Sequence, residues 1–505
     1  MDYRQQLTPL DHHNSSLEAN VRPREWTNPK PDGRYNLVVI GAGTAGLVAA
    51  AGAAGLGAKV AIIERGLMGG DCLNSGCVPS KSLISAARQI AAIHGASDFG
   101  VRIGKPEIDF SQIMERMRRM RAQLSAHDSA QRFRGLGIDV FFGEACFSGS
   151  NSIVVASQEL RFLKACVATG ARATVPEIPG LAESGFLTNE SLFSITELPP
   201  RLVVLGGGPI GCEMAQCFAR FGSQVTLIDT GSQLLANDDE AAAKLVQAAL
   251  EKDGVEILLN CKVTQITGKG RAREIVVSGL DGEKRLQCDQ LLLSVGRTPN
   301  VEGLGLENVG VEFDPRHGVV VDDYLRTTHR DIYAAGDVCS RFKFTHAADF
   351  MARLVIQNAL FMGRVRASKL LIPWCTYTSP EVAHVGLSLK QAAELGIELT
   401  TYTQPFQALD RAVLDGEESG YVSVYCRKGT DRILGATVVA EHAGDMIGEL
   451  VMAMKQRIGL KKIASIIHPY PTQSEAIRKL GDQFNRQRLT PWVKSLFARW
   501  LSWGR

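Results

Sequence analysis

The chain has 505 residues, about three times the usual length of a single domain, and 45% of them are hydrophobic against 22% charged. These proportions predict a globular protein with a large core and exclude disordered and fibrous chains. With 56 basic and 53 acidic residues the formal net charge is +3, so no strong electrostatic field indicates a nucleic-acid partner.

The first 33 residues are polar and contain four prolines, so residues 1–33 are predicted to form a flexible N-terminal arm. They lack the basic stretch followed by an apolar stretch that directs secretion. The eleven cysteines are an odd number in a long chain, which argues against an extracellular disulfide framework. We therefore expect a cytoplasmic protein.

A repeated pattern follows this arm. Residues 37–64 (LVVIGAGTAGLVAAAGAAGLGAKVAIIE) and residues 202–229 (LVVLGGGPIGCEMAQCFARFGSQVTLID) match at a constant offset of 165. Each copy reads as an apolar strand, a Gly-x-Gly-x-x-Gly turn, a small-residue helix, a second strand and a terminal acid, a pattern specific for dinucleotide binding. Residues 37–58 are uncharged and long enough to span a bilayer, but their six glycines argue against a membrane helix. Two copies predict two bound dinucleotides.

Each part of the pattern has a physical role. The first glycine permits a tight turn, the second lets the backbone approach a pyrophosphate, and the third lets helix and strand pack closely. The pyrophosphate lies at the helix N-terminus, and the acid accepts hydrogen bonds from ribose hydroxyls. These residues are Gly41, Gly43, Gly46 and Glu64 in the first copy and Gly206, Gly208, Gly211 and Asp229 in the second.

Two cysteines lie shortly after the first copy, in the run GGDCLNSGCVPSK over residues 69–81. Cys72 and Cys77 precede a helical pattern and can close a small disulfide loop, and a helix N-terminus would lower the pKa of the nearer thiol. Buried structural thiols and half of a zinc site are the alternatives. No second cysteine pair or histidine cluster supplies further zinc ligands, so no metal site is predicted and a redox-active disulfide is the preferred interpretation.

These runs resemble the class I pyridine nucleotide-disulfide oxidoreductases over about residues 36–485. That family includes dihydrolipoamide dehydrogenase, glutathione reductase and mercuric reductase. Further resemblances to its motifs lie at residues 168–170 (ATG), 295–300 (VGRTPN), 332–337 (IYAAGD), 379–386 (SPEVAHVG) and 468–475 (HPYPTQSE).

The resemblance implies an α/β fold with two Rossmann-like dinucleotide-binding domains, for FAD and NAD(P), and a C-terminal α+β dimerisation domain. The FAD-binding domain would span residues 34–194 and 291–367, the NAD(P)-binding domain 195–290, and the dimerisation domain 368–485. The resemblance further implies one FAD per subunit, NADH or NADPH as electron donor, and a homodimer whose active sites are shared between the subunits.

The resemblance also assigns roles to residues. Electrons would pass from the nicotinamide to FAD and then to the disulfide, with Cys77 facing the flavin and Cys72 meeting the substrate. Lys81 would lie beside the flavin and pair with Glu213, while His346, in the run FTHAA, is assigned a structural role. The implied FAD-binding residues are Gly41, Gly43, Gly46, Glu64, Gly70, Asp71, Lys81, Thr169, Gly170, Arg297, Gly336 and Asp337, and the implied NAD(P)-binding residues are Gly206, Gly208, Gly211, Asp229 and Gly296.

The motif at 468–475 departs from the thiol-disulfide members. These use a histidine just before Pro-Thr, oriented by a glutamate, as acid and base for the substrate thiol. Here Tyr470 occupies that position, although Glu475 is retained. The pKa of a tyrosine is about 10 and that of a histidine about 6.5, so Tyr470 cannot shuttle protons in the same way. The nearest histidine in this motif, His468, lies two residues away. An acceptor that needs no protonated leaving thiolate, a soft metal ion or a quinone, is favoured.

Mercuric reductases also carry tyrosine at this place, so the sequence is similar to theirs. Their C-terminal vicinal cysteines and N-terminal Cys-x-x-Cys module are missing, because no cysteine precedes Cys72 and the chain ends RWLSWGR. Whether Hg(II) is a substrate stays open. Asp229 would bind a ribose 2′-OH and repel a 2′-phosphate, and residues 230–236 contain no arginine, which favours NADH over NADPH.

Residues 486–505 are predicted to form a basic amphipathic tail. Such a helix lies on an anionic membrane surface, as a peripheral contact, or packs on its own dimer. The functional hypothesis is an NAD(P)H oxidoreductase with a small acceptor. The alternatives are a dihydrolipoamide dehydrogenase-type reductase and a membrane-associated flavoprotein redox partner. The residues that carry the tail pattern are Trp492, Lys494, Leu496, Arg499, Trp500, Trp503 and Arg505.

Overall fold

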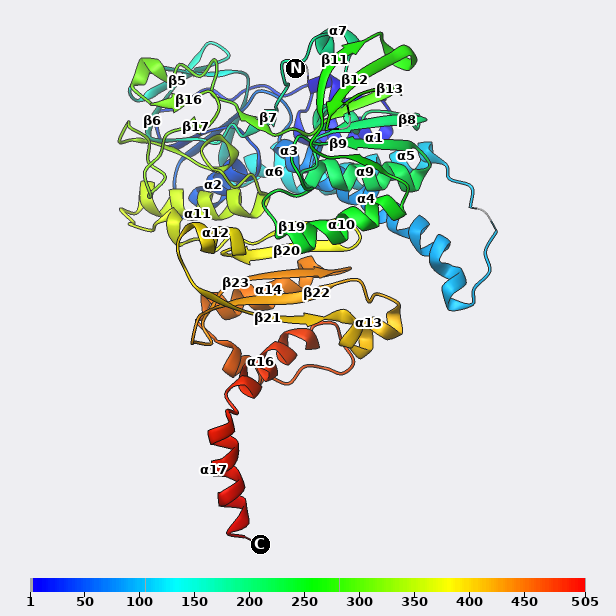
Figure 1. The fold of residues 1–505 in the computed structure, drawn as a ribbon. Helices are drawn as coiled ribbons and strands as arrows, with labels where there is room; N and C mark the ends of the chain where they lie inside the picture. The colour runs from blue at the N-terminus through cyan, green and yellow to red at the C-terminus, as the bar shows by residue number, and fades with distance from the viewer. Residues whose placement is uncertain (1–2, 105, 281, 505) are drawn as a thin grey trace. The chain divides into compact units, whose positions relative to one another are not determined.

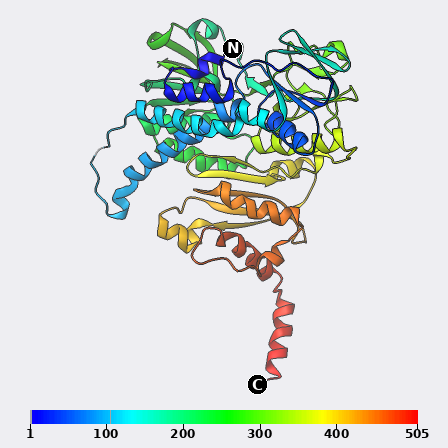
Figure 2. The ribbon, with the colours of Figure 1, turned by 180° about the vertical axis from the view of Figure 1, so that it is seen from behind.

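The computed structural model describes residues 3–104, 106–280 and 282–504. The chain divides into two compact units. Unit 1 comprises Met1–Thr230 and Asn260–Leu370, and unit 2 comprises Gly231–Leu259 and Leu371–Arg505. Figure 1 follows the chain from the N-terminus in blue to the C-terminus in red, and Figure 2 gives the view from behind.

A seven-stranded sheet organises the first part of unit 1. Its order is β3-β2-β1-β6-β5-β4, and β18 also pairs with β6. The strands β1, β2 and β3 are parallel because a crossover connects each pair, whereas β4, β5 and β6 are antiparallel. The strands are β1 (Arg34–Ile40), β2 (Val60–Glu64), β3 (Ile138–Phe142), β4 (Ala145–Gly149), β5 (Ser152–Val155), β6 (Gln158–Val167) and β18 (Ile332–Ala334).

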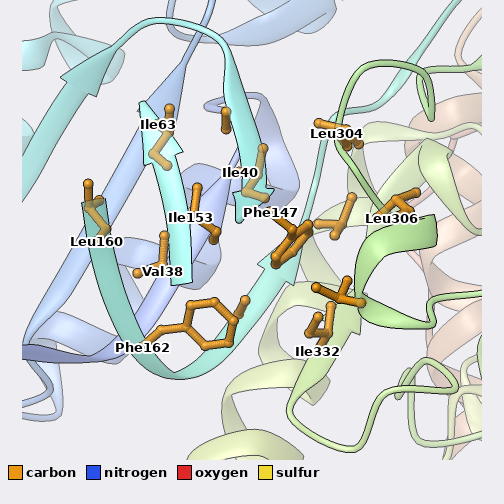
Figure 3. Close-up of a cluster of buried hydrophobic side chains, with 14 of the residues drawn as sticks. Val38, Ile40, Ile63, Phe147, Ile153, Leu160, Phe162, Leu304, Leu306 and Ile332 are labelled. Carbon is orange, nitrogen blue, oxygen red and sulfur yellow. The ribbon is translucent and has the colours of Figure 1, made fainter. Parts of the chain in front are cut away.

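One apolar cluster joins strands that are far apart in the sequence. Val38 and Ile40 of β1, Phe147 of β4 and Ile332 of β18 are buried in it together (Figure 3). The ring of Phe147 meets that of Phe162 edge to face, with centroids 6.1 Å apart. The strand at 332–334 belongs to the same sheet as residues 34–167 because it pairs with β6. Burial of its side chains in this cluster is the main term that stabilises that arrangement.

The helices around this sheet place the cysteine run. The helix α2 (Thr44–Gly55) connects β1 to β2 and lies beside α11 (Thr345–Leu360) (Figure 1). The cysteines fall in α3 (Gly70–Asn74) and at the start of α4 (Cys77–Gly95), which packs on α5 (Phe110–Leu124) and α9 (Pro209–Phe221). Shorter helices of this unit are α6 (Ala130–Gly135), α7 (Leu181–Ser184) and α8 (Asn189–Leu192).

The second copy of the repeated pattern folds like the first. The parallel strands β9, β8 and β14 lie side by side in this order, and Leu202 pairs with Val225 as Leu37 pairs with Val60, each shifted by 165 residues. An antiparallel sheet, β11-β12-β13, follows within the same unit. These strands are β8 (Arg201–Leu205), β9 (Gln224–Ile228), β11 (Lys262–Thr267), β12 (Arg273–Gly279), β13 (Gly282–Cys288) and β14 (Gln290–Leu293).

Unit 2 contains a five-stranded antiparallel sheet in the order β19-β20-β23-β22-β21. The helices α14 (Ala443–Lys455) and α16 (Glu475–Gln487) contribute buried residues to its core, such as Leu450 and Leu480. The fold class predicted from the sequence is confirmed. The strands are β19 (Trp374–Thr376), β20 (Glu381–Gly386), β21 (Leu399–Pro405), β22 (Tyr421–Arg427) and β23 (Ile433–Ala440), and further helices are α10 (Glu240–Lys252), α12 (Leu389–Glu394), α13 (Asp410–Asp415) and α15 (Leu460–Ile463).

The prediction of a flexible arm over residues 1–33 is wrong for most of its described residues. His12–Val21 form the helix α1, which begins at the N-cap Asp11 and buries Leu17 and Val21 completely. Farther on, the indole of Trp26 donates to the carbonyl of Val140, at 3.1 Å. The polar composition misled because several of these polar side chains, such as Asn14 and Asn28, bond to partners more than one hundred positions away. Residues 1–2 lie outside the described residues.

The helix α17 (Pro491–Ser502) occupies most of the predicted tail, and Arg505 of that prediction lies outside the described residues. Within the described ranges, no helix combines the length and the apolar character that crossing a membrane requires.

Candidate active site

The two cysteines lie on adjacent short stretches of backbone at the start of α4. Both are free thiols in the structure, Cys77 exposed and Cys72 partly exposed. Cys77 is the first residue of α4, and its Sγ lies 3.2 Å from Oγ1 of Thr345, the first residue of α11. The sulfur therefore lies at the N-termini of two helices, where peptide dipoles favour a negative charge.

The two thiols differ in acidity. The hydrogen bond with Cys72 lowers the pKa of Cys77 to about 6, and the hydroxyl of Thr345 and the positive charge of Lys81 act in the same direction. The same hydrogen bond with Cys77, together with burial, raises the pKa of Cys72. At neutral pH the pair therefore holds one proton on Cys72 and a thiolate on Cys77.

A lysine one helical turn after Cys77 is fixed by a buried acid. The ammonium of Lys81 lies 2.8 Å from Oε2 of Glu213, whose side chain is only 5% exposed on α9. The packing of α4 on α9 brings these residues together across 132 positions. Lys81 is thus held on the same face as Cys77, in the pairing that the sequence analysis predicts.

The first dinucleotide turn is built from backbone in close contact. A Cβ added to Gly46 would lie 1.8 Å from the carbonyl oxygen of Gly41, so only glycine allows the helix to start there. Gly43 is the N-cap of α2. A Cβ on Gly70 would lie 2.6 Å from the Cα of Gly43. The carboxylate of Glu64 accepts from the amide of Ala42 at 2.7 Å, and burial raises its pKa. The N-terminal amides of α2 and this carboxylate thus face one another across a bare backbone surface.

The second turn repeats this arrangement. The amide of Gly207 donates to Oδ2 of Asp229 at 2.5 Å, 165 residues after the Ala42–Glu64 pair. A Cβ on Gly211 would lie 1.9 Å from the Gly206 oxygen, and Gly208 is the N-cap of α9. Because both turns present free helix N-terminal amides beside an acid, both have the donor and acceptor groups that a pyrophosphate and a ribose need.

The remaining predicted FAD residues converge from later in the chain. Gly336 has φ +81°, and a Cβ on it would lie 3.1 Å from the Cβ of Ala45 in α2. The carboxylate of Asp337 lies 3.5 Å from Nε of Arg297, and burial raises its pKa. Arg297 also pairs with Asp71, directly before Cys72. The motifs at 69–81, 295–300 and 332–337 therefore meet in one place within unit 1.

Three further predicted residues, Thr169 and Gly170 of the FAD group and Gly296 of the NAD(P) group, have a more structural setting. The hydroxyl of Thr169 donates to the carbonyl of Asn300 at 2.7 Å, and the amide of Asn300 donates to Gly170, which has φ +69°. Gly296 has φ +126°, and its carbonyl accepts from the amide of Thr174. These bonds join the connection after β6 to the segment after β14, so these residues shape the backbone that bears Arg297.

The motif at 468–475 belongs to unit 2. The side chain of Tyr470 is exposed, and its hydroxyl donates to Oδ2 of Asp410 at 2.9 Å, which raises the tyrosine pKa. Glu475 forms an ion pair with Arg478 at 2.7 Å. His468 has only 7% of its side chain exposed, and its Nε2 lies 2.9 Å from Oε1 of Glu449. Glu475 and His468 are thus each held by a neighbouring charged side chain of unit 2.

The sequence analysis missed two features of the cysteine site. The first is Thr345, in the FTHAA run beside His346. A hydroxyl at this place gives no sequence signal of a contact with a thiol 268 residues away. The second is Arg121, buried on α5, which donates to the carbonyl of Asn74 between the two cysteines at 2.7 Å. Among the described residues, no group of three or more histidine, cysteine or acidic side chains could hold a metal ion.

Comparison with known proteins places this geometry in context. Residues 35–352 match the family model of the pyridine nucleotide-disulphide oxidoreductases, and residues 372–480 match that of their dimerisation domain. The chain is 32% identical to the mercuric reductase of Staphylococcus aureus, over 90% of this chain and 83% of that protein. It is 34% identical to the dihydrolipoyl dehydrogenase of Bacillus subtilis, over 87% and 94%.

Solved structures give a similar result. The Cu(II) complex of the HOCl-induced flavoprotein disulfide reductase RclA from Escherichia coli superposes with a TM-score of 0.78 at 30% identity, covering 88% of this chain and 98% of that one. The structure of LpdA from Mycobacterium tuberculosis superposes with a TM-score of 0.80 at 26% identity, covering 89% and 99%.

Proposed function

The chain belongs to the class I pyridine nucleotide-disulphide oxidoreductase family, and we propose that it carries electrons from NADH through FAD to the Cys72–Cys77 pair and then to a soft metal ion or a quinone. In each cycle NADH gives up the equivalent of a hydride, two electrons and one proton, which opens the disulfide to a thiol on Cys72 and a thiolate on Cys77. The disulfide forms again when the pair passes the two electrons to the acceptor, and the thiol proton goes to the solvent with a metal ion or to the reduced ring with a quinone.

The residues around Gly43 fit FAD. The Gly43–Gly70 contact leaves bare backbone for a pyrophosphate, Glu64 supplies a ribose acceptor, and Asp337 and Arg297 add a buried charged pair. A flavin bound there would accept a hydride and pass its electron pair to the cysteines. The chain's own residues bind and orient it.

The observation that carries the proposal is the place of the Cys77 sulfur, 3.2 Å from Oγ1 of Thr345 at the N-termini of α4 and α11 and near Lys81. A thiolate at neutral pH is the reactive form toward a disulfide partner, an oxidised ring or a soft metal ion. Thr345 and the N-termini of α4 and α11 hold the charge on this sulfur, while Cys72 retains its proton as the exchangeable thiol. Lys81, fixed by Glu213, places a positive charge beside the same sulfur and favours the electron-rich state of the site.

The setting of Tyr470 supports an acceptor other than a disulfide. Its phenol is exposed and bonded to Asp410, which raises its pKa further from neutrality. The phenol therefore keeps its proton at neutral pH, whereas reduction of a disulfide substrate needs a group that gives a proton to the leaving thiolate and takes one up again. The name of the similar mercuric reductase and the Cu(II) complex of the similar RclA support metal ions as the first acceptors to test.

An acceptor panel tests this choice. The FAD-loaded protein is reduced with one equivalent of NADH without oxygen, and flavin reoxidation is followed after addition of Hg(II), Cu(II), a benzoquinone or lipoamide. We expect rapid reoxidation by a metal ion or the quinone and slow reoxidation by lipoamide. Fast turnover with lipoamide alone would contradict the proposal and favour the second candidate, a dihydrolipoyl dehydrogenase.

The second candidate has its own support in the 34% identity to the Bacillus subtilis enzyme and in the retained Glu475. It also gives a matched variant. If a proton shuttle is what this chain lacks, Tyr470→His should raise lipoamide turnover by about tenfold or more, within the usual range of general acid–base effects, and leave metal-ion turnover nearly unchanged. An equal effect on both acceptors would show that Tyr470 acts by shape instead.

A further inference from the structure

The helix α17 has an apolar half that is left exposed by the described residues of unit 2. All of its described residues are at least partly exposed, and Trp492, Phe497, Trp500 and Leu501 show between 53% and 72% of their area. In Figure 1 no other labelled element lies beside α17, and in the reverse view of Figure 2 the red C-terminal helix likewise has no ribbon alongside it. Three of the chain's five tryptophans lie in it or one residue beyond its end.

The two halves of α17 are cleanly separated. At about 100° per residue, the large apolar residues fall on one half of the helix circumference, and the charged and hydroxyl residues fall on the other half together with Ala498. Lys494 and Arg499 belong to the polar half. The apolar half consists of Trp492, Val493, Leu496, Phe497, Trp500 and Leu501, with Trp503 just after the helix end.

The charge around this helix has one sign. From Gln483 to the end of the printed sequence there are five basic residues and no acidic residue, in a chain that is otherwise almost neutral. The helix itself is well started, with Pro491 at its first position and the hydroxyl of Thr490 accepting from the Val493 amide. A helix of 12 residues is marginal in water by itself, so its apolar half needs a surface to cover it.

The helix lies outside the part of the chain that matches the dimerisation-domain model, because that match ends at residue 480 and α17 begins at Pro491. The family's dimerisation domain therefore does not by itself account for a surface that covers α17. At about 1.5 Å per residue the helix is roughly 18 Å long, too short for a hydrocarbon core of about 30 Å. It has the length and pattern to lie flat at a membrane interface, where tryptophans are favoured and basic residues meet anionic lipid headgroups.

We propose that α17 is a membrane-docking helix that binds the surface of an anionic lipid bilayer through its apolar half and its flanking basic residues. Such docking brings the enzyme to the layer in which apolar acceptors dissolve. The inference rests on α17 alone and holds whatever acceptor the cysteine site serves.

The test is flotation of the FAD-loaded full-length protein with vesicles in a density gradient. Vesicles of phosphatidylcholine with phosphatidylglycerol in equal parts are compared with vesicles of phosphatidylcholine alone. We expect the protein to float with the anionic vesicles and to be released by high salt, because salt screens surface charge. A protein that floats with neither would overturn the proposal.

Two variants locate the binding face. Lys494→Glu with Arg499→Glu reverses the charge and should weaken binding by about tenfold or more, and Trp492→Glu with Trp500→Glu should abolish it. The matched control is Lys369→Glu with Lys390→Glu, which changes the net charge equally at two exposed lysines elsewhere and should leave flotation unchanged. Turnover with NADH and a water-soluble acceptor should be the same in every variant.

The tryptophan variant also distinguishes the other occupant of this face. If Trp492→Glu with Trp500→Glu converts dimers to monomers in light scattering without vesicles, then a second copy of the chain covers the apolar half, and the membrane proposal is wrong. Retained flavin absorbance in both variants shows that each protein is folded.

Discussion

Cys77 and Cys72 are chemically alike but differ in what surrounds the sulfur. Cys77 lies at the first residue of α4 and within 3.2 Å of the first residue of α11, so two helix N-termini and Lys81 act on it. Cys72 instead donates its proton toward that sulfur. This division of charge follows from the placement of the residues and gives the dithiol one nucleophile at neutral pH.

The acidity of Cys77 predicts a pH profile. In the NADH-reduced protein, alkylation of Cys77 by iodoacetamide should be half-maximal near pH 6, the pKa of this thiol. Below this pH the thiolate is protonated and the rate falls; above it the rate levels off. Mass spectrometry of the modified peptide identifies the cysteine. A midpoint near the ordinary thiol value of about 8.5 would contradict the account.

Thr345 is predicted to contribute to this acidity. Thr345→Val removes the hydroxyl 3.2 Å from Sγ and leaves the side-chain shape nearly unchanged, so the alkylation midpoint should move upward by about one pH unit. Thr401→Val, at an exposed residue of β21, is the control and should not move it. The same shift in both variants would assign the effect to general destabilisation.

Asp229 is predicted to set the choice of nucleotide. Its carboxylate ends β9 and accepts from the amide of Gly207, the place where a ribose would be bound. Asp229→Ser keeps an acceptor for the amide and removes the charge, so the ratio of kcat/KM for NADH to that for NADPH should fall by about tenfold or more. An unchanged ratio would mean that selectivity comes from other residues.

The helix α1 supports the cysteine site from outside the dinucleotide folds. Arg121 of α5 is 1% exposed and donates to the carbonyls of Asn74 and Gln6 and to the side chain of Asn14. Since Asn74 lies between the two cysteines, this one guanidinium joins the N-terminal segment to the segment between Cys72 and Cys77. Burial lowers the pKa of Arg121 to about 10, so it remains charged at neutral pH.

Removing this guanidinium should damage both stability and the site. Arg121→Leu leaves three acceptors, two of them buried, without their donor, at a cost of about 3 kcal/mol, and should lower the midpoint of thermal unfolding of the FAD-loaded protein. It should also raise the alkylation midpoint of Cys77, because the loop is less fixed. Arg119→Leu, on an exposed face of the same helix, should change neither. A loss of stability with an unchanged Cys77 profile would limit Arg121 to a structural role.

The sequence predicts these elements unequally. The two dinucleotide turns were predictable because their constraint is local: at Gly46 and Gly211 any Cβ would strike the backbone five residues earlier. The helix α1 was not, because its buried Asn14 and Asp11 bond to α5 about 107 positions away. Thr345 likewise acts across 268 residues, and no spacing rule reaches that far.

At the scale of the whole molecule, the matched dimerisation domain supports a homodimer. Shared active sites predict complementation between two chains. A subunit with both Cys77→Ser and Tyr470→His cannot form the dithiol, and a native subunit turns over lipoamide slowly, so only their hybrid dimer should contain a site that combines a native Cys77 with the Tyr470→His change. Lipoamide turnover should therefore rise when the two chains are expressed together with different tags and purified on both. Hybrids no more active than either parent would contradict sites built from two subunits.

The relay from nucleotide to dithiol is the central claim, and an anaerobic NADH titration of the FAD-loaded protein tests it most directly. Absorbance is recorded through the flavin bands and at longer wavelengths, in the native chain and in Cys77→Ser. The account predicts that a long-wavelength charge-transfer band grows in the native protein as the dithiol forms, and that this band is absent in Cys77→Ser. Loss of the flavin bands with no such band in the native protein would mean that electrons stop at the flavin, which would contradict the dithiol mechanism.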